Sequence, residues 1–187
     1  MMNTILNSII DKSISDLSKV LDSNITLIGD YAFYKCTSLT SVNIPDSIIS
    51  IGSSAFRDCT SLTSVTIPDN IIRINDLTFS NCNMLSTINI SDNSLITYIG
   101  RSAFEFCKSL VSINIPGCVT TIGKGAFNYC TLLTTVNILC NDPPTLGDSI
   151  FIGCDNLTSI IVPSGCGDIY KNANKWSTYA DKIIEGE

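Results

Sequence analysis

The sequence of 187 residues contains no histidine. Histidine is the usual general base near neutral pH and a common metal ligand, so its absence excludes Ser-His and Cys-His dyads and imidazole metal sites. The sequence also has no G-x-S-x-G motif, no phosphate-binding loop and no C-x-x-C pair. These absences predict a protein that is not an enzyme and that needs no cofactor or metal.

Charged residues are scarce, at 15% of the chain, and acidic ones outnumber basic ones by 17 to 11. Nucleic acids and anionic membrane surfaces are bound by clustered Lys and Arg, so neither is an expected partner. No apolar run is long enough to span a membrane, which argues against membrane insertion. The first ten residues carry no Lys or Arg and no A-x-A site, so a secretory signal peptide is not expected.

What the sequence does have is an internal repeat of about 23 residues. Six copies share the pattern I-G-x-x-A-F-x-x-C-x-x-L-x-S-V-x-I-P-x-x-I-x-x, and they begin at Ile28, Ile51, Ile74, Ile99, Ile122 and Leu146. A unit this short cannot bury its own apolar face, whereas stacked units bury a continuous core. We therefore predict a solenoid within a single domain, with the repeats covering residues 28–167.

Each repeat has two halves with different periodicities. The segment L-x-S-V-x-I alternates apolar and polar residues, which predicts a half-buried strand, and the proline that follows it ends the strand. The segment I-G-x-x-A-F-x-x-C spaces its apolar residues by three and four, which predicts a short helical or 3₁₀ turn. The glycine is expected to adopt a positive φ at the entry to that turn.

Six of the nine cysteines occupy one position of the repeat. They are Cys36, Cys59, Cys82, Cys107, Cys130 and Cys154. Because a small thiol packs well as a hydrophobic side chain, we predict that this column is buried and unpaired. Cys118, Cys140 and Cys166 lie outside the column, and a Cys118–Cys140 disulfide is an alternative to free thiols there.

The repeat resembles that of the BspA-like leucine-rich repeat family of the Treponema pallidum type, most clearly over residues 51–73 and 99–121. The resemblance implies an α/β leucine-rich repeat fold, a curved right-handed solenoid with a parallel sheet on its concave side. Members of that family are mostly bacterial or protozoan surface proteins that bind host proteins or other cells. Related repeats also occur in virion and tail proteins of gut phages.

Both ends of a solenoid need a cap over the exposed apolar face of the last unit. At the N-terminus we predict a helical cap over residues 1–27, because Ile10, Ile14, Leu17 and Leu21 form one helical stripe. At the C-terminus we predict a helical cap over residues 168–187. Its apolar residues are Ile169, Tyr170, Trp176, Tyr179, Ala180 and Ile183.

The third repeat departs from the pattern in two places. Asn75 replaces the glycine, and two extra residues lie within 91–98. The insertion is interpreted either as a tolerated loop or as a protrusion that binds a partner. Asp46 and Asp69 recur one repeat apart at the turn after the strand. In the absence of a calcium-loop motif they are interpreted as solvated turn residues.

The outward strand positions form a ladder of small uncharged hydrogen-bonding side chains. This ladder includes Asn43, Thr66, Asn89, Asn114 and Asn137. It lacks the Arg and Tyr anchors of tight interfaces, so the contact it predicts is broad, weak and strengthened by many copies.

Aromatic residues at variable positions are the candidate anchors. Phe106 and Tyr129 occupy the same position in adjacent repeats, near Lys108, and we expect the two rings to be neighbours. Tyr98 is a further candidate contact.

The composition, the repeat and the resemblance together favour a non-enzymatic interaction or adhesion module. Such a module binds a protein or cell-surface partner through the solenoid face. The alternative is a structural component of a larger assembly, such as a phage virion or tail decoration protein, with homo-oligomer or particle contacts. Both alternatives predict a cell-surface, extracellular or virion-associated location rather than that of a cytoplasmic enzyme.

Overall fold

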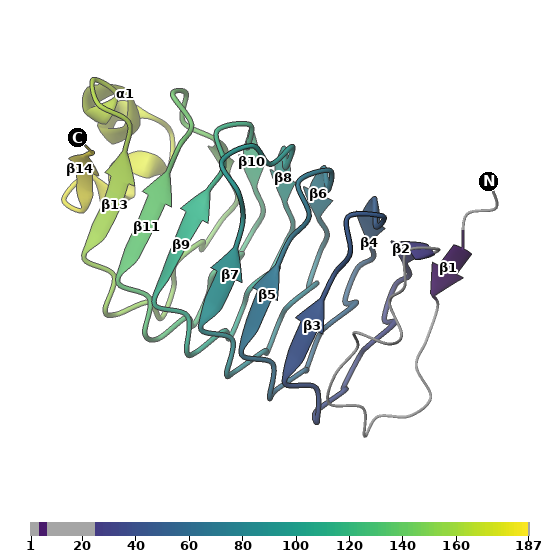
Figure 1. Ribbon diagram of the computed structural model, residues 1–187. Helices are drawn as coiled ribbons and strands as arrows, with labels where there is room; N and C mark the ends of the chain where they lie inside the picture. Colours follow the sequence, from purple (N-terminus) through teal and green to yellow (C-terminus); the bar gives the residue numbers. More distant parts are fainter. Residues whose placement is uncertain (1–3, 7–24, 187) are drawn as a thin grey trace.

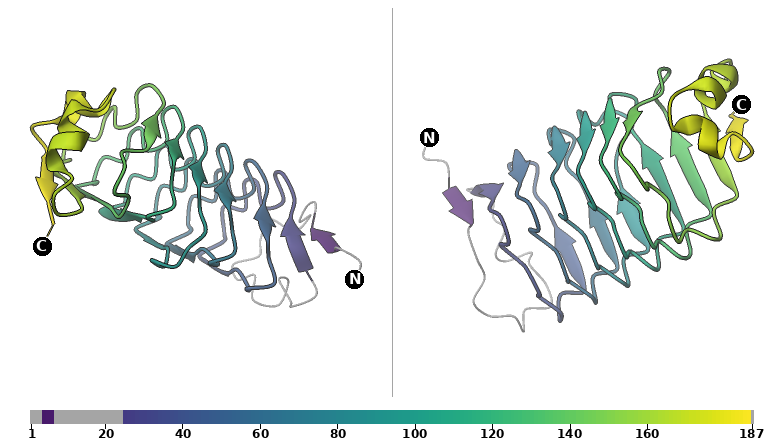
Figure 2. Two further views of the ribbon diagram at one scale, coloured as in Figure 1. Left: turned by 90° about the horizontal axis from the view of Figure 1, so that it is seen from above. Right: turned by 180° about the vertical axis from the view of Figure 1, so that it is seen from behind.

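The computed structural model describes residues 4–6 and 25–186, and in them the chain winds into a right-handed solenoid (Figure 1). Each turn of the solenoid, here called a rung, carries one longer strand on the front face and a two-residue strand behind it (Figure 2). The front strands are β3 (Ser41–Asn43), β5 (Ser64–Thr66), β7 (Thr87–Asn89), β9 (Ser112–Ile115), β11 (Thr135–Ile138) and β13 (Ser159–Val162). The rear strands are β4 (Ser50–Ile51), β6 (Arg73–Ile74), β8 (Tyr98–Ile99), β10 (Thr121–Ile122) and β12 (Thr145–Leu146).

The front strands confirm the period-2 prediction. Val42 pairs with Val65, and Val65 pairs with Ile88, so equivalent residues of successive rungs face each other in parallel register. All three side chains are buried, whereas their neighbours on the same strands are exposed or half-buried. The repeat length therefore sets the register of the sheet, because each rung places the same residue at the same height.

The core is a column of stacked aromatic rings. Phe33, Phe56, Phe79, Phe104, Phe127 and Phe151 follow one another at centroid separations of 5.0, 5.3, 5.6, 5.5 and 5.7 Å. The first five rings are fully buried, with no exposed surface. Inward isoleucine, leucine, valine and cysteine side chains surround them, so one continuous core runs through all six repeats.

The prediction of a helical turn between the glycine and the cysteine is wrong. The N–H of Phe33 donates to the carbonyl of Ala55 in the next rung at 2.8 Å, while the N–H of Cys36 donates locally to the carbonyl of Phe33. The N–H groups of this segment thus bond in turn to the next rung and to their own segment. This pattern requires residues with left-handed backbone angles, such as Ser54 at φ 55° and Asp58 at φ 61°. The segment therefore bonds its rung to the next one, which a helical turn could not do.

The expected positive φ of the Ile-Gly glycine is also wrong. The described glycines with positive φ are Gly125, Gly153 and Gly165, and none of them is the glycine at the second position of the repeat. At Gly123, an Ile-Gly glycine, an added Cβ would lie 2.6 Å from the backbone nitrogen of Arg101 in the preceding rung. Glycine is required there because the backbones of successive rungs approach too closely to admit a side chain.

The third rung interrupts the rear sheet at Asn75. Strands β4 and β6 do not pair, although β6 pairs with β8 and β2 (Ile25–Ile28) pairs with β4. In the next rung the N–H of Gly100 donates to the carbonyl of Ile74 at 2.7 Å. At Asn75 the side-chain Nδ2 makes the equivalent bond, to the carbonyl of Ile51 at 2.7 Å. The Asn75 side chain therefore holds the rungs together where its own Cβ keeps their backbones apart.

Asn75→Ala is expected to lower the free energy of unfolding by about 1–3 kcal/mol, because it removes this bond and leaves the carbonyl of Ile51 without its donor. Asn75→Gly should cost less, since the rungs can then close and form the backbone bond seen at Gly100. Urea unfolding of both variants checks this, and equal losses in the two would show that the amide has no bonding role.

The front sheet is interrupted one rung later. No backbone hydrogen bond joins β7 to β9 in the described part of the chain, so the front strands form two sheets, β3-β5-β7 and β9-β11-β13-β14. The break coincides with the two-residue insertion. The inserted turn bonds to itself, from the N–H of Ser94 to the carbonyl of Ser91, and to the second rung, from the N–H of Leu95 to the carbonyl of Asp69.

The helical caps are only partly as predicted. The apolar stripe of the predicted N-terminal helix lies outside the described residues. The described residues at either end of that region are strands, because β1 (Thr4–Leu6) pairs in parallel with β2. At the C-terminus α1 (Gly167–Asn172) and the 3₁₀-helix η1 (Trp176–Tyr179) are followed by β14 (Ile183–Glu185).

Strand β14 pairs in parallel with β13 and continues the front sheet. The Glu185 carboxylate accepts the N–H groups of Gly165 and Gly167 at 3.0 and 2.8 Å, which lowers the pKa of that carboxyl group. The sequence pattern missed this strand because it is a single strand without a repeat of its own.

The cysteine column is buried and forms no disulfide, as predicted. Each thiol from the second rung on donates to the carbonyl of the column phenylalanine in the preceding rung. Examples are Cys59 to Phe33 at 3.1 Å and Cys82 to Phe56 at 3.2 Å. Cysteine therefore supplies a small apolar side chain and a weak donor to a buried carbonyl. Burial raises the pKa of the Cys82 thiol well above its ordinary value.

A thiol reagent is expected to label two of the nine cysteines in the folded protein. Cys118 is exposed and Cys166 is half-buried, whereas Cys140 is buried with the column. Burial keeps the reagent away from a thiol, and where it also raises the pKa, as at Cys82, less of the reactive thiolate is present. Mass spectrometry after labelling at pH 8 checks this, with urea-unfolded protein as the control for full labelling. Rapid labelling of all nine in native buffer would contradict it.

Candidate functional site

The outward ladder forms one row along the front face. Asn43 pairs with Thr66, Thr66 with Asn89, and Asn114 with Asn137. All are exposed except Asn137, which is half-buried. Within each sheet the side chains bond across rungs, from Asn89 Nδ2 to Thr66 Oγ1 at 3.2 Å and from Asn137 Nδ2 to Asn114 Oδ1 at 3.4 Å.

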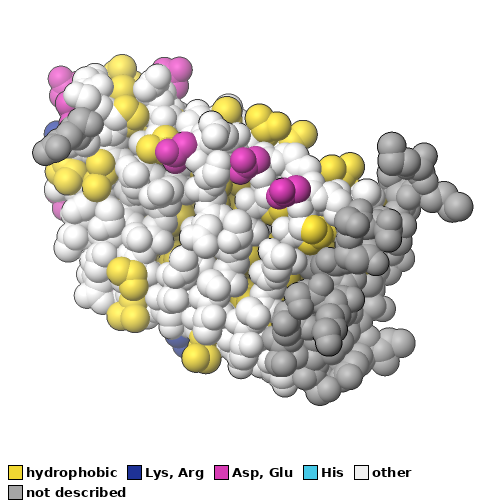
Figure 3. Space-filling view, viewed as in Figure 1, with side chains coloured by type: hydrophobic (Ala, Val, Ile, Leu, Met, Phe, Trp, Pro, Cys, Tyr) yellow, Lys and Arg dark blue, Asp and Glu magenta, His cyan; other side chains and the backbone are white. Residues whose placement is uncertain are grey.

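The front face carries few charged side chains, and a row of acidic ones follows its upper edge (Figure 3). This face therefore offers hydrogen bonds over its middle and negative charge along one margin. Such a surface fits a partner with polar, uncharged groups and some positive charge.

The break between β7 and β9 opens a hollow of about 260 Å³ in the ladder. The hollow, here called the break hollow, has Thr66 and Asn89 on one side and Asn114 on the other. Ile88 and Ile90 also line it, and each keeps 8% of its surface exposed. Three of the five ladder residues named above therefore gather at the one place where the described front strands are not bonded to each other.

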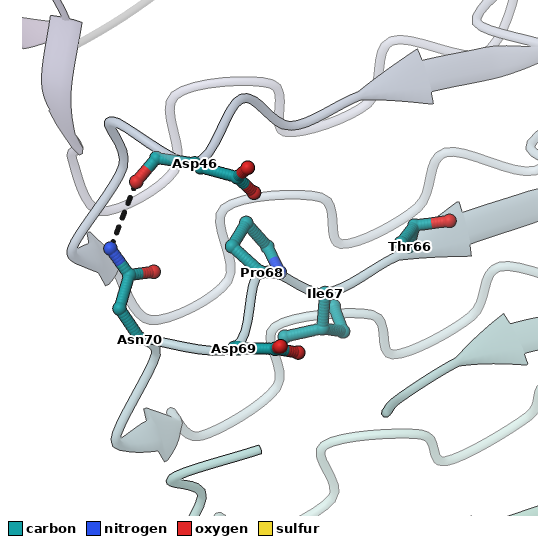
Figure 4. Close-up of a pocket in the computed structure, with 6 residues that line it drawn as sticks. All are labelled: Asp46, Thr66, Ile67, Pro68, Asp69 and Asn70. Carbon is teal, nitrogen blue, oxygen red and sulfur yellow. Dashed lines mark hydrogen bonds between the residues drawn. The ribbon is translucent and has the colours of Figure 1, made fainter. Parts of the chain in front are cut away.

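A second hollow of about 310 Å³ adjoins the first at the upper edge (Figure 4). This acidic hollow is lined by Asp46, Thr66, Ile67, Pro68, Asp69 and Asn70. The carboxylates of Asp46 and Asp69 lie on either side of the Pro68 ring. The repeat pattern predicts solvated turn residues at both aspartate positions and does not indicate a hollow between them.

The aromatic residues predicted to be neighbours are stacked. The rings of Phe106 and Tyr129 lie 4.7 Å apart at an interplanar angle of 6°, and Lys108 Nζ lies 5.9 Å from the Phe106 centroid. Tyr129 also covers Gly153, where an added Cβ would lie 2.5 Å from its ring. Tyr129 is 41% exposed and Phe106 is half-buried. Neighbouring rungs thus occupy both faces of the Tyr129 ring, which leaves its edge exposed.

Tyr98 lies on a rear strand, away from the aromatic pair. The guanidinium of Arg73, which pairs with Tyr98 across β6 and β8, stands 3.9 Å from its ring centroid. That distance is typical of a cation–π contact. Tyr98 is half-buried, so much of its ring is engaged within the protein.

The comparisons with known proteins agree with this geometry. The sequence matches the BspA type leucine rich repeat region, in six copies, over residues 12–95 and 51–181. The chain belongs to the BspA-type leucine-rich repeat family. None of the curated proteins compared with it matches the sequence.

Solved structures of leucine-rich repeat proteins resemble the solenoid. The T. pallidum leucine-rich repeat protein TpLRR is 30% identical, with a TM-score of 0.69 and 82% of each chain covered. A leucine-rich repeat protein from Bacteroides ovatus is 29% identical, with a TM-score of 0.66 over 89% of this chain. This chain spans 41% of the B. ovatus protein. A Eubacterium ventriosum protein, 19% identical with a TM-score of 0.52, shares the fold.

Proteins of the BspA type are generally binding modules rather than enzymes, and they are typically associated with surfaces. Among the residues that the structure describes, no group of three or more His, Cys, Asp or Glu side chains could hold a metal ion. Within the same residues no helix is long and apolar enough to cross a bilayer.

Proposed function

We propose that this BspA-type solenoid is a non-enzymatic interaction module that binds a protein or cell-surface partner through its front face. The observation that carries the proposal is the ladder of uncharged donors and acceptors on the front face, which runs in register across β3, β5 and β7 and again across β9 and β11. Hydrogen-bonding side chains fixed in a regular row lose little conformational entropy on binding, which favours a broad contact.

The contact should be weak for a single chain and strong for many chains together. The ladder offers amides and hydroxyls rather than the large aromatic and arginine anchors that dominate tight interfaces. Presentation of many copies on one surface would raise the overall affinity without any new contact. Adhesion to a cell is one setting with this property, and assembly on a particle is another.

The stacked pair Phe106 and Tyr129, with Lys108, is the second candidate contact. The exposed edge of Tyr129 favours it, since an aromatic side chain with free surface can anchor a partner. The occupied ring faces and the half-buried position of Phe106 favour the front face instead.

Photo-crosslinking in the source cells tests the proposal. A benzoylphenylalanine in place of Asn43 or Asn114 should give a covalent adduct with a partner protein, whereas the same group in place of Tyr129 should give none. An adduct with coat or tail subunits of a particle would identify the assembly role. Adducts only from the position of Tyr129 would contradict the choice of face.

A further inference from the structure

We propose that the acidic hollow and the break hollow form one binding site for an extended polypeptide segment with a lysine or arginine side chain. The acidic hollow would receive the cationic side chain, and the break hollow the main chain beside it. This inference rests on the proposed function and specifies where on the front face the partner binds and what chemistry it presents.

The acidic hollow is rich in hydrogen-bond acceptors. Asp46 and Asp69 supply two exposed carboxylates, and the two ion pairs among the described residues, Lys175–Asp148 and Lys182–Asp181, involve neither of them. Because a carboxylate only accepts hydrogen bonds, the cavity favours a group that only donates, such as an ammonium or a guanidinium.

Asn70 adds to the negative potential of this hollow. Its Nδ2 donates to the main-chain carbonyl of Asp46 at 2.9 Å, which fixes the orientation of the amide. Its Oδ1 is buried and has no hydrogen-bond partner. An unsatisfied carbonyl dipole held in a region of low dielectric constant stabilises a nearby positive charge more strongly than it would in water.

The apolar wall of the acidic hollow suits the stem of a long basic side chain. Ile67 and Pro68 line it beside the carboxylates, and both are buried. Lysine and arginine place their methylene groups on such surfaces while the charged end reaches acceptors. A bare metal ion would gain nothing from this wall.

The break hollow offers groups that match a peptide main chain. The amides of Asn89 and Asn114 each carry two donor hydrogens and an acceptor oxygen, as needed to bond the N–H and C=O of one peptide unit. Because β7 and β9 are not bonded to each other, backbone groups along the break have no partner strand. A segment that lies over the break would therefore bond chiefly to these amide side chains.

The two hollows are continuous. Both are lined by Thr66, Ile67 and Asp69, so a chain that lies over these three residues contacts both hollows. In an extended chain alternate side chains point to the same side. One basic side chain can therefore enter the acidic hollow while the next peptide units lie over Asn89 and Asn114.

Titration of the ¹⁵N-labelled full chain with short peptides tests this site. The probes are acetyl-Gly-Thr-Val-Lys-Val-Thr-Gly-amide and the same peptide with Glu in place of Lys. We expect the Lys peptide to shift the backbone amide signals of residues 66, 67, 69, 70, 88–91 and 114, and to bind at least tenfold more tightly than the Glu peptide. Equal affinities, shifts confined to other residues, or no shift at up to about 10 mM peptide would overturn the proposal.

Variants of the two hollows separate their roles. Asp46→Asn with Asp69→Asn should remove the preference for the Lys peptide, a loss of at least tenfold. The matched pair Asp142→Asn with Asp155→Asn, both exposed, removes the same net charge elsewhere and should leave the preference intact. If both pairs reduce binding equally, net charge rather than the acidic hollow is responsible, and the site is refuted.

The main-chain part of the site has its own variant. Asn89→Ala with Asn114→Ala should weaken binding of both peptides, while the Lys preference remains. Unchanged binding would refute the role of the break hollow. Failure of these peptide experiments alongside front-face adducts in photo-crosslinking would refute the site and leave the proposed function standing.

Discussion

Phe56→Ala is expected to lower the free energy of unfolding by about 3–5 kcal/mol, the cost of a large cavity in a packed core. The Phe56 ring is fully buried and stacks on Phe33 at 5.0 Å and on Phe79 at 5.3 Å. Its loss removes contacts on both faces, and the neighbouring rungs cannot close the gap because their backbones are already bonded at fixed spacing. Urea unfolding followed by circular dichroism measures the change.

Thr66→Ala is the matched control for this prediction, since Thr66 belongs to the same repeat and faces solvent. It accepts one bond from Asn89 at 3.2 Å, so its loss should stay within about 0.5 kcal/mol. Similar losses for Phe56→Ala and Thr66→Ala would contradict the assignment of inside and outside.

Deletion of residues 167–187 is expected to abolish the soluble, cooperatively folded monomer. Trp176 and Tyr170 are fully buried in this segment, and they donate to the carbonyls of Pro144 at 2.7 Å and Cys140 at 2.8 Å. The deletion would expose the apolar end of the sixth rung and leave those carbonyls unpaired. It would also turn β13 into an open edge that can pair with another chain.

Light scattering after size-exclusion chromatography, together with thermal melting, measures the effect of the deletion. The control is Ile169→Ser with Ile184→Ser, which changes two exposed side chains of the same segment and should leave the monomer and its melting nearly unchanged. A truncated chain that remains monomeric and melts as the full chain does would show that this segment is not a cap.

The repeat made most of the solenoid predictable from the sequence. Recurrence of Phe, Cys and Val at fixed intervals predicted the buried columns, because one position of the repeat has one environment in every rung. The same regularity predicted the exposed row of Asn and Thr on the front strands. It also marked residues 91–98 as the place where the stacking changes.

The turn and the hollows were not predictable in the same way. The spacing of Ala, Phe and Cys fits a helical turn, but bonding between rungs outweighs it and requires left-handed residues such as Ser54 and Asp58. The acidic hollow depends on how the turns of two rungs pack against each other, and the sequence of a single repeat does not determine that packing. The sequence shows that Asn75 replaces the repeat glycine. Its bond to the carbonyl of Ile51 can be predicted only from the three-dimensional spacing of the rungs.

For the aromatic pair, variation at a repeat position did not predict how exposed the side chains are. Phe106 and Tyr129 stand at a variable position, which suggested surface anchors. In the structure they adopt positive φ, at 60° and 57°, and stack on each other.

Binding measured on two variants tests the central claim, that the front face is the interaction surface. The partner recovered by crosslinking is titrated against Asn114→Arg with Asn137→Arg on the front face, and against Phe106→Ser with Tyr129→Ser in the turns that precede the front strands β9 and β11. Both variants are first shown to be folded by circular dichroism. We predict that the front-face pair weakens binding at least tenfold, about 1.4 kcal/mol, while the aromatic pair retains the affinity of the unmodified chain. Retained binding in the front-face variant, with loss in the aromatic variant, would contradict the account.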